Sequence, residues 1–246
     1  MINDNLVLIV GKSASGKSMS LHTLQPPEGV MYLNCEAGKK LPFPAKFKKG
    51  SDGKHGFTIT DPHQVYEAFE AAENMPDIHT IVVDSLTYLM DMYESIYVLN
   101  SANTMKAWDD FAQYNKRLMQ EYVAKSTKNV IFIAHTVDSV NESEMVLETK
   151  VPVKGSLKNQ GIESYFSIVI AAKRVALKTL KDYHNPLLKI TPREEKLGYK
   201  YVFQTQVTKE TVHERLRGPI GLFSDEETFI DNDVQQLLDR LHQYYQ

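Results

Sequence analysis

LVLIVGKSASGKSMSL, residues 6–21, decides the fold of this protein. Its apolar beginning predicts a buried β-strand, and the pattern Gly11-x-x-x-x-Gly16-Lys17-Ser18 follows directly. Glycines at this spacing let backbone N–H groups curl around a polyphosphate at the positive end of the next helix. Lys17 is expected to reach the β- and γ-phosphates, and the Ser18 hydroxyl to bind Mg²⁺. The predicted nucleotide-binding residues are Gly11, Lys12, Ser13, Ala14, Ser15, Gly16, Lys17, Ser18 and Met19.

Length and composition are those of a globular protein. The chain has 246 residues, of which 42% are hydrophobic and 24% charged, and its formal net charge is −3. No apolar run is long enough to span a membrane, the beginning does not resemble a signal peptide, and the single cysteine excludes an internal disulfide. We therefore expect a cytoplasmic protein with no membrane partner, and a single domain over 1–246 with its core at about 5–175.

The hydrophobic pattern predicts an α/β fold in which helices flank a mostly parallel central sheet. Further buried strands are predicted at 30–34, 78–83, 129–134 and 165–172. A helix of two or three turns is expected after the phosphate-binding loop, and further helices at 61–74 and 86–125. Beyond residue 186, the stretches 187–191 and 199–207 predict an antiparallel pair joined by a charged turn, followed by a helix that closes the chain.

Polar residues stand at the carboxyl ends of the predicted strands, where open parallel sheets bind ligands. Asp84 ends the third strand and is expected to hold Mg²⁺ through its water shell. Ser85 follows it where many motor ATPases have a glutamate, which leaves Glu36, at the end of the second strand, as the available acid. His135 ends the fourth strand and is predicted to sense the γ-phosphate; a histidine bonded only to its neighbours is the alternative.

Charge is distributed unevenly along the chain. Residues 146–200 carry eleven lysines and arginines against five acids, inside an otherwise acidic sequence. Such a block is typical of an anion-binding face, and equally of a solvated lysine-rich surface. Charge alone leaves both interpretations open.

Several motifs together resemble the RecA-like recombinase core. These are the phosphate-binding loop, a glutamate ending the next strand, VVDS at 82–85, and a polar residue ending the fourth strand before a glycine-containing loop. LNCE (33–36), VKGSLK (153–158) and KETVHER (209–215) are similar to segments of the phage-encoded RecA-like single-strand annealing proteins. The resemblance covers nearly the whole chain.

This resemblance implies a role for each matching residue. Glu36 would orient the attacking water, Asp84 would be the magnesium partner, and His135 falls where the RecA-like core usually has glutamine. The loop region 137–161 would meet DNA, with contacts expected from Lys154, Gly155, Lys158 and Asn159. Basic residues that reach a neighbour's nucleotide would be Lys209 and Arg215.

The implied function is ATP hydrolysis with Mg²⁺ by a DNA-stimulated enzyme that binds single-stranded DNA and promotes annealing and homologous recombination. Implied partners are single-stranded DNA, a single-strand-binding protein and further copies of the chain in a ring or short assembly. The main alternative is an ATPase that acts on a protein partner, such as a helicase loader or packaging accessory. A small-molecule kinase lacks its arginine-rich lid, since Arg117 is the only arginine between Lys17 and Lys173, and a scaffold without turnover does not need Glu36.

Overall fold

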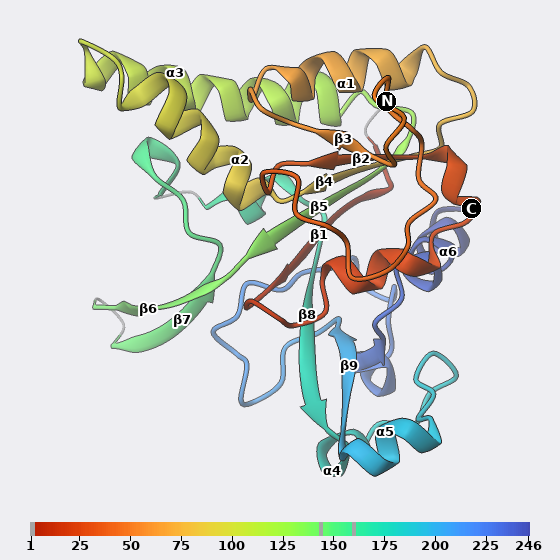
Figure 1. The fold of residues 1–246 in the computed structure, drawn as a ribbon. Coiled ribbons are helices and arrows are strands. Elements are labelled where there is room, and N and C mark those ends of the chain that lie inside the picture. The colour runs from red at the N-terminus through yellow and green to blue at the C-terminus, as the bar shows by residue number, and fades with distance from the viewer. Residues whose placement is uncertain (1–2, 143–144, 159–160) are drawn as a thin grey trace.

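An eight-stranded sheet forms the centre of the molecule, in a computed structural model that describes residues 3–142, 145–158 and 161–246 (Figure 1). Its strand order is β10-β9-β8-β1-β5-β4-β2-β3, and β6 and β7 pair separately. The strands are β1 (Leu6–Gly11), β2 (Val30–Asn34), β3 (Phe57–Thr58), β4 (Thr80–Asp84), β5 (Asn129–His135), β6 (Val137–Asn141), β7 (Val146–Lys150), β8 (Ile168–Ala176), β9 (Tyr199–Gln204) and β10 (Phe229–Asp231).

The strands from β8 to β3 run parallel, which confirms the predicted α/β fold with a mostly parallel sheet. β1 lies between β5 and β8, and its last residue, Gly11, is in register with His135. Asp84 ends β4 opposite Asn34, the last residue of β2. Since carboxyl ends of parallel strands meet at one edge of a sheet, this register brings the polar strand ends together beside the phosphate-binding loop.

Helices cover both faces of the sheet (Figure 1). They are α1 (Gln64–Glu73), α2 (Leu86–Tyr93), α3 (Thr104–Arg117), α4 (Leu177–Leu180), α5 (Pro192–Leu197) and α6 (Val234–Tyr245), with 3₁₀ turns at Ser18–Thr23, Pro27–Gly29, Gly155–Lys158, Ile162–Tyr165 and Asp225–Thr228 and π-helical turns at Glu94–Val98 and Leu118–Val123. Leu8 packs in the apolar cluster with α1–α3, whereas Val7 and Ile9 pack with α6. Within the described ranges, no helix has the length and apolar character needed to cross a bilayer.

The predicted pairing of 187–191 with 199–207 is wrong. β9 pairs antiparallel with β8 on one side and with β10 on the other. The charged stretch between the two predicted strands is helical because Thr191 forms a capping box with Glu194 and Pro192 occupies the first turn of α5. Gly198 ends this helix at a φ of 75°, and the chain then enters β9.

Three other segments also differ from their predicted form. The helix expected after the phosphate-binding loop is a short 3₁₀ turn. Residues 137–150, predicted to be part of a loop, form the β6–β7 hairpin, which projects from the end of β5 (Figure 1). Its side chains are exposed or half-buried, so no buried apolar run marks these strands in the sequence. β8 begins at Ile168, later than predicted, and its extension to Ala176 places Lys173 and Arg174 inside the strand.

Candidate nucleotide-binding site

The loop between β1 and the first 3₁₀ turn has a backbone that suits its glycines. Gly16 has a φ of +95°, and a Cβ added there would lie 3.0 Å from both the Tyr201 ring and the Asn232 amide nitrogen. A Cβ on Gly11 would lie 2.6 Å from the carbonyl oxygen of Ala172. Side chains at these positions would therefore displace the walls behind the loop. The loop stays narrow because β8, β9 and the segment after β10 pack against it.

Lys17 is held inside the loop rather than in solvent. Its residue is only 5% exposed, and its Nζ donates to the carbonyl oxygens of Gly11 and Lys12, both at 2.8 Å. Burial lowers the pKa of Lys17 to about 8, and the carboxylates of Asp84 and Glu36 oppose this shift. The buried ammonium is thus placed at the mouth of the loop, where phosphate oxygens can replace its carbonyl partners.

Asp84 has one satisfied and one unsatisfied carboxylate oxygen. Oδ2 accepts hydrogen bonds from the Ser18 hydroxyl at 2.9 Å and the Tyr32 hydroxyl at 3.0 Å. Oδ1 is buried and has no hydrogen-bond partner in the described part of the chain. Burial raises the pKa of Asp84, and the hydrogen bond from Ser18 opposes this rise.

This pair fits Mg²⁺, which takes oxygen ligands and in nucleotide sites relies on few protein groups besides phosphates and water. An orphaned buried carboxylate oxygen beside a serine hydroxyl supplies such groups. Among the residues that the structure describes, no cluster of three or more His, Cys, Asp and Glu side chains could hold a metal by itself. A magnesium ion here would therefore depend on the nucleotide for most of its ligands.

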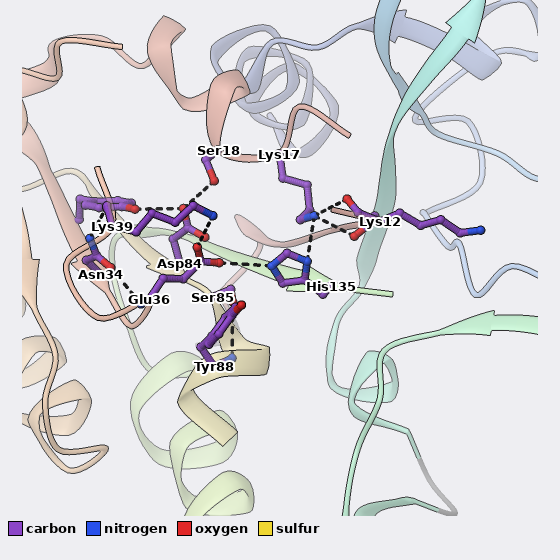
Figure 2. A network of polar contacts seen from close by, with 12 residues as sticks. Lys12, Lys17, Ser18, Asn34, Glu36, Lys39, Asp84, Ser85, Tyr88 and His135 are labelled. Carbon is purple, nitrogen blue, oxygen red and sulfur yellow. Dashed lines mark hydrogen bonds and ion pairs between the residues drawn. The ribbon is translucent and has the colours of Figure 1, made fainter. Parts of the chain in front are cut away.

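Glu36, His135 and Lys17 form a row of polar contacts across the strand ends (Figure 2). The Glu36 Oε1 lies 3.2 Å from the His135 Nε2, and the His135 Nδ1 lies 3.5 Å from the Lys17 Nζ. Because an ammonium only donates, Nδ1 is the acceptor in this contact, and Nε2 carries the hydrogen directed at Glu36. The hydrogen bond from His135 is the main reason that the pKa of Glu36 is lowered to about 2. The histidine therefore links Lys17 to Glu36.

Lys17, Ser18, Glu36, Asp84 and His135, all predicted from the sequence, line one cavity of about 740 Å³. Residues 39–42 and the α5–β9 segment, including Arg193 and Tyr201, also line this cavity. The side chain of Lys12 points away from this row (Figure 2). Its Nζ lies 2.5 Å from the Asp138 Oδ2 of the hairpin.

Sequence reasoning missed Tyr32, Lys39 and Tyr88. Tyr32 donates to Asp84, Lys39 forms an ion pair with the Glu36 Oε2 at 2.7 Å, and the ring of Tyr88 packs edge-on against His135 at 5.7 Å between centroids. A hydroxyl inside the apolar strand 30–34 was a usable signal, since a buried tyrosine needs an acceptor. Nothing in the sequence marks the partner of Tyr88.

Of the residues predicted to contact DNA, the described ones, Lys154, Gly155 and Lys158, do not line this cavity. Lys154 is ion-paired with Glu94 and lies 3.5 Å from Asp91. A Cβ on Gly155 would lie 3.0 Å from the Trp108 ring, so this backbone packs on α3. Lys158 is exposed, and Asn159 lies outside the described residues.

The two residues predicted to act on a neighbour differ in their surroundings. Lys209 is exposed in the turn after β9. Arg215 is paired inside its own chain, at 3.4 Å from Glu148 and 3.7 Å from Glu163. Lys209 is thus the freer of the two to reach another molecule.

A glycine-rich loop that follows the central strand β1, with a buried lysine and with a serine bonded to the aspartate that ends β4, two strands away, defines a P-loop NTPase-type domain. The model of the AAA domain family matches residues 3–212, and the chain belongs to that family. This membership indicates a nucleotide-binding ATPase. No curated protein matches the chain.

Proposed function

We propose that this protein is a RecA-like, Mg²⁺-dependent ATPase that binds single-stranded DNA and promotes annealing in homologous recombination. The observation that supports ATP hydrolysis is the row of polar contacts from Lys17 through His135 to Glu36. It joins a group that binds phosphate to a group that can accept a proton, and hydrolysis of a triphosphate needs both.

Each side chain in the site has a definite task in this proposal. Lys17 exchanges its carbonyl partners for β- and γ-phosphate oxygens of ATP. Glu36 orients the attacking water and accepts its proton, and His135 fixes the Glu36 carboxylate through Oε1. Ser18 and Asp84 are the residues that would hold Mg²⁺, which neutralises phosphate charge when bound.

ATP hydrolysis by Glu36→Gln tests the catalytic part. We expect turnover to fall by about 100-fold or more, as for loss of a general base, while ATP binding is retained. Glu28→Gln, which changes an exposed glutamate outside the cavity, is the control and should hydrolyse ATP normally. Wild-type turnover in Glu36→Gln would overturn the role of Glu36.

The DNA-binding part is supported by the position of the basic segment. β6 begins at Val137, directly after the residues that contact the nucleotide cavity, and the chain reaches Lys154 and Lys158 after β7. A change at His135 can therefore be passed along the chain, through the β6–β7 hairpin, to this segment. Lys158 is exposed and available to a phosphate, whereas Lys154 must first leave Glu94.

Binding of a single-stranded oligonucleotide, measured at several salt concentrations, tests this part. Each lysine–phosphate contact contributes about 0.7 to the slope of log K against log salt for single strands, so Lys158→Ala should reduce the slope by that amount. Lys116→Ala, an exposed lysine of α3, is the control. Absence of binding at low salt, together with ATP turnover that ignores DNA, would contradict the DNA proposal.

A protein partner is the second candidate, because the β6–β7 hairpin is apolar and acidic. Val140 is 65% exposed and Leu147 57%, and Asp138 and Glu148 lie on the same strands. Exposed apolar side chains between carboxylates favour a protein surface over a DNA backbone. Under this candidate the protein hydrolyses ATP but neither binds DNA nor responds to it.

We also propose that the working form is a homo-oligomeric ring or short assembly in which Lys209 reaches the nucleotide of a neighbour. Its exposure, against the internal ion pairs of Arg215, supports this choice. Mixing Lys209→Ala with Lys17→Ala tests it. Because an intact Lys209 of one subunit would then face an intact cavity of the other, the mixture should hydrolyse more ATP than the two variants do separately. Strictly additive activity would contradict the proposal.

A further inference from the structure

The turn after β2 is built to place Lys39 on the carboxylate of Glu36. The Asn34 side chain holds both arms of this turn: its Oδ1 accepts from the Glu36 N–H at 2.9 Å, and its Nδ2 donates to the Lys39 carbonyl at 2.8 Å. The Lys39 N–H closes the turn by donating to the Glu36 carbonyl at 3.0 Å. Asn34 is only 8% exposed, so this clamp belongs to the packed part of the molecule.

The turn also contains backbone strain. Its central residues, Ala37 and Gly38, have φ values of 51° and 76°. Alanine in this left-handed region is uncommon, and a non-glycine residue there costs free energy. Crowding by neighbouring atoms does not explain this conformation, because a Cβ added to Gly38 would contact only Thr58, at 3.8 Å. The hydrogen bonds of Asn34 hold the turn in a conformation that an unconstrained loop would avoid. The result is that Lys39 is placed beside Glu36.

The position of Lys39 conflicts with the task of Glu36. Both carboxylate oxygens of Glu36 are engaged, Oε1 by His135 and Oε2 by Lys39 at 2.7 Å (Figure 2). A carboxylate that accepts from two donors, one of them a cation, is a poor proton acceptor. The Lys39 side chain is 67% exposed, so little packing opposes its departure from Glu36, and it lines the same cavity as Lys17.

We propose that Lys39 is a second cationic group for the γ-phosphate, which leaves Glu36 when a nucleoside triphosphate binds and so frees Oε2 to accept the proton of the attacking water. The inference rests on the proposed ATPase function and extends it. The γ-phosphate supplies the competing negative charge, so a triphosphate releases Glu36 and a diphosphate does not. Glu36 would thereby activate water only when the γ-phosphate, whose bond is to be broken, is present.

The test is the binding of two probes, ATPγS and ADP, each with Mg²⁺, to the full chain. If Lys39 contacts the γ-phosphate, Lys39→Ala should weaken ATPγS binding by about tenfold, as expected for loss of a charge-assisted contact, and ADP binding by less than about twofold. Lys39→Arg should recover most of this selectivity. Lys46→Ala is the matched control, because Lys46 is exposed in the same lysine-rich segment and does not line the cavity.

The pH dependence of kcat/KM separates this role from a purely local one. Removing Lys39 frees Oε2 in the nucleotide-free enzyme, so the acid limb of kcat/KM should move to higher pH in Lys39→Ala and stay in place in Lys46→Ala. A shift of the acid limb without any change in the ATPγS-to-ADP ratio would mean that Lys39 acts on Glu36 only, and it would overturn the γ-phosphate contact. The ratio of ATPγS to ADP binding does not depend on turnover. If the wild-type protein failed to hydrolyse ATP, the proposed function would be wrong, but the ratio would still show whether Lys39 contacts the γ-phosphate.

Discussion

Gly16→Ala gives the most direct test of how the fold shapes the phosphate-binding loop. An alanine at φ +95° carries the left-handed penalty, about 1–2 kcal/mol. Its Cβ would lie 3.0 Å from the Tyr201 ring and from the Asn232 amide, and such overpacking adds about 1–2 kcal/mol. The sum, about 2–4 kcal/mol, corresponds to a fall in Tm of roughly 5–15 °C for a chain of this size.

Gly53→Ala is the matched control, because Gly53 has a φ of +75° with nothing within 4 Å of its added Cβ. It should therefore show only the left-handed penalty, a fall in Tm of roughly 2–8 °C. Thermal unfolding gives both values, and titration with ADP shows whether the loop still binds phosphate. We expect Gly16→Ala to lose at least about tenfold in ADP affinity and Gly53→Ala to lose none. Equal falls in Tm with ADP binding retained in both variants would refute the view that Tyr201 and Asn232 fix the loop.

Three further changes test neighbouring parts of the molecule. Tyr32→Phe removes one donor to Asp84 and should lower the free energy of unfolding in urea by about 1.5–3 kcal/mol, whereas Tyr88→Phe, at an exposed ring, should change it by less than about 0.5 kcal/mol. The pKa of Glu36 is lowered from 4.5 to about 2, so its carboxylate stabilises the folded state fully above pH 4.5, and this contribution is lost as the pH falls through 2. Urea unfolding of wild type and Glu36→Gln should therefore differ by a constant amount above pH 5, and the difference should change by roughly 3 kcal/mol toward pH 2. A pH-independent difference would contradict the contact with His135. Thr191→Ala removes the capping box of α5 at a cost of about 1 kcal/mol, which amide hydrogen exchange should detect as faster exchange confined to that helix and its flanks; unchanged exchange there would show that β9 packing, not the cap, holds the helix.

The phosphate-binding loop and the polar strand ends could be found from the sequence because their signals are local. An apolar run followed at once by Gly11, Asp84 or His135 shows where a buried strand stops, and the geometry of parallel sheets then places all such stops at one edge. Glu36 follows from the same rule. These inferences need no knowledge of which strands are neighbours, since every order of parallel strands leaves their carboxyl ends on the same side.

Pairing and contact across the sequence were decided only by the tertiary structure. β9 joins β8, not the stretch 187–191, because a capping box that begins at Thr191 makes the intervening segment helical and leaves β8 as the free neighbour. The contacts of Tyr32 with Asp84 and of Lys39 with Glu36 depend on strand register and on a strained turn, which no local pattern encodes. The sequence alone therefore determined which chemical groups lie at the site, whereas the fold determined which of them touch, because a hydrogen bond requires ångström-scale positions that only packing between distant segments sets.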